Sequence, residues 1–448
     1  MILLYNATIV NESQRYVGYV AVESQYIKQV GHGEAPQVLI DAADEAVDLG
    51  GNLLMPGVID THVHFRDPGL TAKGDMATET VAAVMGGVTS FLDMPNTIPP
   101  TVSRKAIDDK KLRAAEVSLA NYGFFIGATN DNEEEILQAD FTGIAGVKVF
   151  MGSSTGNMLV DDESTLDRVF REVKVPVAVH AEDNAIIKAN IEAIAAEYPD
   201  GDIPVDRHPD IRSSKACVSA TAKAVEIARK YGTHLHVCHI STADELQFFT
   251  RGDLSAKKIT AETCPHYLFF DRNDYDRLRS RIKCNPAIKE CSDRLALLKA
   301  VIEGRIDTIA TDHAPHLLES KAGNALTAAS GMPGIEFSLA LMLELADENP
   351  SLTEERIVEL MCHNPARIFN IDRRGFIREG YFADLVVVGQ CSLKIKDEDV
   401  HSRCGWTPLA GTMLRRRPVM TMVNGRVVMS GGRLTGDRPA LPLKFNNQ

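Results

Sequence analysis

Two histidines separated by one residue, His62 and His64, stand at the end of an apolar segment, 56–65. In a β-strand, residues i and i+2 project to the same face, so both imidazoles can point at one spot. Imidazole nitrogens are common ligands of zinc. The pair therefore predicts one half of a metal site.

The other half is predicted from ligand-type residues at the ends of later apolar segments, namely His180, His239 and Asp312. Taken singly, each could be an ordinary polar residue at a strand end. As an ordered set they favour a divalent metal centre. His234 and His236 compete with His239 for one of these positions, and the strand end favours His239.

Lys148 is the unusual member of this set, because a buried ammonium without a partner is costly and cations repel it. A neutral amine beside a metal can react with CO₂ and become an N-carboxylated lysine, whose two oxygens can bridge two ions. Alternatively, Lys148 faces solvent or pairs with a substrate anion. The residues alone leave these alternatives open.

The central part of the chain alternates strand and helix. Predicted helices lie at 73–86, 102–119, 163–173, 213–231, 292–304 and 335–347, and predicted strands at 56–65, 88–94, 123–128, 144–150, 176–181, 233–240, 258–263 and 306–312. This pattern predicts an α/β fold, a (β/α)₈ TIM-like barrel, rather than an open doubly wound sheet. The candidate residues follow the C-terminal ends of the strands, where barrel enzymes carry their active sites.

Both ends of the chain have short alternating strands, and Asn424-Gly425 is a typical hairpin turn. We therefore expect residues 1–55 plus 380–448 to form one small composite β-sandwich domain. The barrel domain would span residues 56–379.

Composition excludes several classes of protein. The 448 residues carry a formal charge of −13, which argues against a nucleic-acid partner. The basic run 415–417 is interpreted as a solvated turn. The eight cysteines contain no C-x-x-C pair, which indicates free thiols in a reducing compartment. Neither a signal peptide nor a membrane span is evident, so we expect a cytoplasmic protein without a membrane partner.

The sequence resembles the amidohydrolase superfamily and, within it, the dihydroorotases. The motifs that carry the resemblance are His62-Val-His64-Phe-Arg66-Asp-Pro-Gly, Asp93-Met-Pro-Asn96-Thr, Val179-His180-Ala-Glu, Cys238-His239-Ile-Ser, Asn285-Pro286 and Thr311-Asp312-His313-Ala-Pro-His316. They span all the predicted barrel strands.

The resemblance implies a binuclear centre with two Zn²⁺ per chain. One ion would be held by His62, His64 and Asp312, and the other by His180 and His239. N6-carboxylated Lys148 and a hydroxide would bridge them. Some relatives have an aspartate at the position of Lys148, so the lysine aligns this chain with the carboxylated-lysine members.

The implied reaction is the reversible zinc-dependent cyclisation of N-carbamoyl-L-aspartate to L-dihydroorotate in de novo pyrimidine biosynthesis. In the hydrolytic direction the bridging hydroxide is the nucleophile, and Asp312 acts as general acid and base. By the same resemblance Arg66, Asn96 and His316 hold the substrate carboxylate, while Asn285 and the backbone near 332–334 meet the ring. A surface arginine that caps the 67–69 turn is the alternative for Arg66.

Allantoinases and dihydropyrimidinases (hydantoinases) share the metal set and are the nearest alternatives. The segment from Glu262 to Leu268 resembles the hydantoinase version of its strand, and loop 317–330 follows the dihydroorotase pattern only loosely. A non-catalytic partner subunit is a remote alternative, since every ligand position is filled. The resemblance favours a homo-oligomer, commonly a dimer, and leaves open an association with a carbamoyltransferase.

Overall fold

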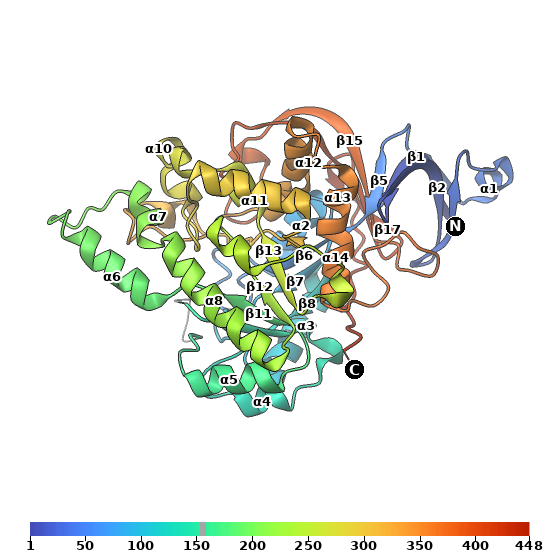
Figure 1. The fold of residues 1–448 in the computed structure, drawn as a ribbon. Helices are drawn as coiled ribbons and strands as arrows, with labels where there is room; N and C mark the ends of the chain where they lie inside the picture. The colour runs from blue at the N-terminus through green and yellow to red at the C-terminus, as the bar shows by residue number, and fades with distance from the viewer. Residues whose placement is uncertain (153–157, 448) are drawn as a thin grey trace.

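The computed structural model describes residues 1–152 and 158–447, and its centre is a parallel β-barrel surrounded by helices (Figure 1). The barrel strands are buried on both faces, as expected for parallel strands covered by helices. They are β6 (Val58–Val63), β7 (Val88–Asp93), β8 (Asn121–Phe124), β9 (Ile126–Gly127), β10 (Val147–Phe150), β11 (Val177–His180), β12 (Leu235–Val237), β13 (Ile259–Thr263) and β14 (Thr308–Ile309).

Strand pairing around the barrel is irregular at two places. The third strand is interrupted at Phe125, so that β8 pairs with β7 while β9 pairs with β10. A parallel bridge between Val63 and His313 joins the first strand to the last. All strands predicted for the barrel are present. Seven have shorter bounds than predicted, and the third begins earlier, at Asn121, and is divided into β8 and β9.

The helices cover the outside of the barrel. They are α2 (Met76–Met85), α3 (Arg104–Val117), α4 (Glu133–Leu137), α5 (Glu163–Glu172), α6 (Asn184–Ala195), α7 (His208–Ile211), α8 (Ser214–Tyr231), α9 (Pro265–Phe269), α10 (Tyr275–Leu278), α11 (Cys291–Glu303), α12 (Ser338–Glu348), α13 (Glu354–Val358) and α14 (Asn364–Ile368). Asp75 caps α2 and Asp162 caps α5 by accepting hydrogen bonds from main-chain amides, which ends the preceding loops sharply.

Both chain ends contribute to a second, mostly antiparallel sheet that stands beside the barrel (Figure 1). Its hydrogen-bonded order is β18-β17-β16-β15-β5-β1-β2-β3, with β4 beside β1. The strands are β1 (Ile2–Asn11), β2 (Gln14–Glu23), β3 (Tyr26–His32), β4 (Glu45–Asp48), β5 (Leu53–Pro56), β15 (Leu385–Lys394), β16 (Met413–Val423), β17 (Arg426–Ser430) and β18 (Arg433–Leu434). The short helix α1 (Gln37–Ala42) lies at its outer end.

This sheet curls around its own hydrophobic cluster, in which Val20 and Val22 of β2 meet Leu385 and Val387 of β15. Alternate residues of each strand face this cluster, as the period of a β-strand requires. A bridge between Tyr26 and Phe382 brings the far edge back towards β15. The predicted fold class, a (β/α)₈ barrel with a β-sandwich built from both termini, is confirmed.

The interpretation of residues 415–417 as a solvated turn is wrong. Arg415 and Arg416 lie within β16, next to α12. Arg415 pairs with Glu344 (Nη2–Oε1 2.6 Å) and Arg416 with Asp347 (Nη2–Oδ1 2.6 Å). The run is basic because the helix it packs against is acidic, and the sequence pattern alone did not reveal that partner.

Within the described residues, no helix has both the length and the apolar composition that crossing a membrane would require.

Candidate functional site

A cavity of about 330 Å³ opens at the C-terminal ends of the barrel strands. It brings together every site residue predicted from the sequence. Its lining consists of His62, His64, Arg66, Asn96, Lys148, Phe150, His180, Arg212, His239, Asn285, Asp312, Ala314, His316, Ser330 and Gly331. A larger cavity, of about 750 Å³, lies at the opposite end of the barrel and is lined by His234 and Lys258 instead.

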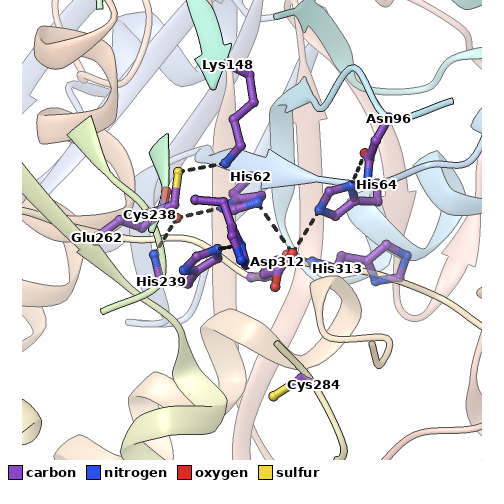
Figure 2. Close-up of polar contacts among 12 residues, drawn as sticks. His62, His64, Asn96, Lys148, Cys238, His239, Glu262, Cys284, Asp312 and His313 are labelled. Carbon is purple, nitrogen blue, oxygen red and sulfur yellow. Dashed lines mark hydrogen bonds and ion pairs between the residues drawn. The ribbon is translucent and has the colours of Figure 1, made fainter. Parts of the chain in front are cut away.

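The first predicted ligand group is compact (Figure 2). The carboxylate of Asp312 lies 2.9 Å from His64 Nε2 and 3.4 Å from His62 Nε2. The three residues come from opposite ends of the barrel sequence, and the bridge that closes the barrel brings them together. Three convergent nitrogen and oxygen donors are the set that a divalent ion such as zinc requires.

The second group lies beside the first. His180 Nδ1 and His239 Nε2 are 2.9 Å apart, and the ring centroids of His62 and His239 are 5.3 Å apart. His236, which competed with His239 in the sequence, points away from this cavity and contacts Thr260 and Glu262. The structure thus places His239 in the cavity lining and His236 outside it.

Acceptors behind these imidazoles, two of them outside the cavity lining, orient the rings. His62 Nδ1 lies 2.8 Å from Glu262 Oε1, and His180 Nε2 lies 3.0 Å from Glu182 Oε2. His64 Nδ1 lies 2.6 Å from Asn96 Oδ1. Because each acceptor takes an N–H, the other ring nitrogen keeps its lone pair and faces the group of ligands.

Sequence reasoning gave no role to Glu262 or Glu182. Both side chains are fully buried, and Glu262 also accepts a hydrogen bond from Thr61 Oγ1. A carboxylate inside an otherwise apolar strand, or two residues after a strand-end histidine, is the signal that could have identified them. Such residues are almost never buried without a partner.

Three of the four histidines are neutral in this environment. Burial lowers the pKa of His64 to about 4, although Asp312 opposes that shift, and burial also lowers the pKa values of His180 and His239. A neutral imidazole is the form that ligates a metal. His62 is the exception: burial and Lys148 would lower its pKa, but the neighbouring Asp312 and Glu262 carboxylates raise it to about 10. The other three imidazoles are in the form that suits a metal centre.

Lys148 is fully buried on β10, where Lys148 and Phe150 alternate towards the barrel interior. Its Nζ lies 3.0 Å from Cys238 Sγ, and no carboxylate among the described residues pairs with it. The alternative of a solvent-facing lysine at the barrel mouth is wrong, because Lys148 is fully buried. Its ammonium lies beside Cys238 and near His62 (Figure 2), and a buried ammonium without an anionic partner is costly.

Arg66 is also buried, with 4% of its surface exposed, which contradicts the alternative of a surface arginine. Its Nη2 lies 3.3 Å from His316 Nε2, while its Nε has no hydrogen-bond partner among the described residues. No carboxylate of those residues forms an ion pair with it. A buried guanidinium without a carboxylate partner is suited to bind an anionic ligand that enters the cavity.

The remaining predicted contacts are arranged as donors. His208 Nε2 lies 3.2 Å from Asn285 Oδ1, so the amide NH₂ of Asn285 is left for the cavity. Residues 332–334, whose backbone was expected to meet the ring, are not among the lining residues; Ser330 and Gly331, just before them, are.

Three cavity residues adopt positive φ angles, namely Arg66 (66°), His239 (41°) and Asp312 (47°). The left-handed region is strained for residues with a side chain. Such outliers concentrate at functional sites, where surrounding structure holds them. The backbone therefore supports the same location for the site as the side chains do.

The variant Glu262→Gln tests whether the carboxylate next to His62 supports metal binding. We expect Glu262→Gln to weaken zinc binding by about 10–100-fold, because the amide no longer holds His62 Nδ1–H as a carboxylate does. Chelator competition measures this affinity. Glu245→Gln, which changes a buried carboxylate bonded to Thr221, is the matched control. Unchanged affinity in Glu262→Gln would show that the contact with His62 is dispensable.

Comparison with known proteins agrees with this geometry. The Amidohydrolase family profile matches residues 53–428, and the chain belongs to this family. It is 35% identical over 416 residues to a dihydroorotase from Halobacterium salinarum, covering 92% of this chain and 93% of the relative. It is 32% identical over 423 residues to a dihydroorotase from Methanosarcina acetivorans, covering 91% and 88%.

A solved structure, the L-hydantoinase (dihydropyrimidinase) from Arthrobacter aurescens, has the same fold. It matches with a TM-score of 0.92 at 25% identity, and the match covers 99% of each chain. The sequence-based recognition of an amidohydrolase that resembles the dihydroorotases is thus confirmed.

Proposed function

We propose that this chain is a dihydroorotase, a hydrolase that acts on a cyclic amide. It would catalyse the reversible cyclisation of N-carbamoyl-L-aspartate to L-dihydroorotate in pyrimidine biosynthesis. The proposal rests on the similarity to dihydroorotases over most of the chain and on the cavity described above.

The observation that carries the substrate assignment is Arg66. It is the guanidinium at the cavity with no carboxylate partner among the described residues, and its Nε is buried and unpaired. Dihydroorotate carries a free carboxylate that can accept two parallel N–H bonds from a guanidinium. Asn96 and His316, beside Arg66 in the lining, complete the proposed carboxylate site.

The donor set fits two zinc ions. His62, His64 and Asp312 would hold one ion, His180 and His239 the other, and N6-carboxylated Lys148 would bridge them. When bound, these ions would polarise the amide carbonyl of the substrate and make a water molecule more acidic. The same ions would compensate the negative charge that Asp312 and a carboxylated lysine bring into a buried site.

Asp312 is the proposed general acid and base. Its carboxylate lies at the cavity wall next to His64, and those contacts keep the pKa of Asp312 well below its usual range against the effect of burial. In hydrolysis it would accept a proton from water and pass it to the leaving ring nitrogen. Cyclisation reverses both transfers.

We further propose that residues 56–379 act as the catalytic barrel domain and that residues 1–55 plus 380–448 act as a composite domain beside it. The protein would work in the cytoplasm on a small-molecule substrate, as a homo-oligomer and preferably a dimer. These assignments rest on the family resemblance.

A substrate comparison tests the proposal. Zinc-loaded protein is expected to turn over L-dihydroorotate at least about 100-fold more efficiently than allantoin or dihydrouracil, since a lost charged contact costs several kcal/mol. Initial rates with each substrate give kcat/KM. The hydantoinase-like segment from Glu262 to Leu268 and the L-hydantoinase fold match favour dihydropyrimidinase as the second candidate. Preference for dihydrouracil would establish that candidate instead.

A further inference from the structure

The connection between β15 and β16 crosses from the terminal sheet to the mouth of the barrel. Asp397 in this connection pairs with Arg281 (2.6 Å), and the main-chain N–H of His401 donates to Glu336 (2.9 Å). The main-chain N–H of Arg403 donates to Glu79 (3.0 Å). These contacts fix the connection to segments that surround the cavity.

Trp406 is the innermost residue of this connection. It is fully buried, and its indole Nε1–H donates a hydrogen bond of 2.7 Å to the main-chain carbonyl of His316. The guanidinium of Arg281 lies 5.2 Å from the ring centroid. Trp406 is therefore held by its neighbours while it holds the backbone of a residue that lines the cavity.

Lys321, which lies near Trp406, supports the neighbouring part of the cavity wall. Lys321 is buried, and its Nζ lies 5.8 Å from the Trp406 ring centroid. That ammonium donates hydrogen bonds to the carbonyls of Ala329 (2.8 Å) and Gly331 (2.7 Å). Trp406 and Lys321 together support the two sides of the wall formed by His316 and Gly331.

We propose that Trp406 is a positioning residue for substrate binding, which sets the place of His316 beside Arg66. This inference rests on the proposed function, because it assigns His316 to the substrate carboxylate. The side chain of Trp406 does not line the cavity, so it acts through the backbone of His316. Its effect belongs to binding of the carboxylate rather than to the metal centre.

The chemistry of the contact predicts the size of the effect. Without the indole N–H, the buried carbonyl of His316 loses its donor, and the segment can shift relative to Arg66. We expect Trp406→Phe to raise KM for L-dihydroorotate about tenfold, with kcat changed less than about twofold and zinc content unchanged. Leu414→Ala, a buried change on β16 outside this connection, is the control and should leave KM unchanged.

A spectroscopic test is available because Trp406 is the only tryptophan in the sequence. Protein produced with 5-fluorotryptophan carries a single ¹⁹F label at this position. We expect its resonance to shift on addition of L-dihydroorotate to the zinc-loaded protein, with saturation. The shift should be absent at the same concentrations in Arg66→Ala.

Two results would overturn the inference, an unchanged KM in Trp406→Phe or an unchanged ¹⁹F resonance at saturating substrate. If Trp406→Phe does not fold, replacement of the tryptophan by benzothienylalanine removes only the N–H and gives the same comparison. Lack of dihydroorotate turnover by the unmodified protein would contradict the proposed function. Turnover with no effect at Trp406 would contradict the positioning role alone.

Discussion

Lys148→Ala is expected to lower dihydroorotate turnover by about a thousandfold or more, which corresponds to roughly 4 kcal/mol of transition-state stabilisation. The physical reason is that Lys148 is buried in the same cavity lining as both groups of proposed ligands, with no carboxylate partner in the described chain. Its loss would remove the proposed bridging anion from the proposed metal centre. Steady-state kinetics and zinc analysis measure both effects.

The matched control for this prediction is Lys258→Ala, which removes an exposed lysine at the opposite end of the barrel. Turnover and zinc content should be unaffected there. Short carboxylic acids added to Lys148→Ala should restore part of the activity, because they can replace the missing anion. Full turnover without such additives, or fully active parent enzyme with at most one zinc ion, would contradict the bridging role.

Arg66→Ala should leave the zinc content unchanged and weaken dihydroorotate binding by about 2 kcal/mol or more, or roughly thirtyfold in KM. The guanidinium is buried beside His316 and its Nε is unpaired, so the substrate carboxylate is the partner that the variant would lose. Saturation kinetics with dihydroorotate measure the change, and metal analysis shows whether the centre is intact.

Two further variants test whether the effect at Arg66 comes from its paired N–H groups and whether it is specific to this residue. Arg66→Lys keeps the charge but not the paired N–H geometry, so we expect an intermediate KM. Arg113→Ala removes a nearby arginine that pairs with Asp67 outside the cavity, and it should have little effect. Equal KM values for Arg66→Ala and the parent enzyme would show that the carboxylate binds elsewhere.

The barrel could be predicted because its strands are short apolar runs separated by amphipathic helices, a pattern that local sequence determines. The strand bounds could not, because pairing stops wherever a residue such as Asp312 turns away with a positive φ. Nor could the role of Arg415 and Arg416 be predicted. Their acidic partners on α12 and α13 are about 60 to 70 residues away in sequence, and only the packed fold brings them together.

The candidate site could be anticipated residue by residue where function requires an uncommon side chain at a strand end, as with His62 or Lys148. Their placement in one cavity agrees with that prediction, while their roles as ligands remain predictions. Glu262 and Trp406 were not anticipated. Each acts through another residue, and nothing in the local sequence shows which neighbour a buried carboxylate or indole will meet.

The left-handed backbone at Arg66, His239 and Asp312 affects where stabilising substitutions can be made in this protein. Each such residue costs on the order of 1 kcal/mol or more relative to a relaxed backbone, and glycine would avoid that cost. Glycine would relax the backbone there, but it would also remove buried side chains that line the cavity and leave space behind them. An engineered stable variant should therefore be sought elsewhere in the chain.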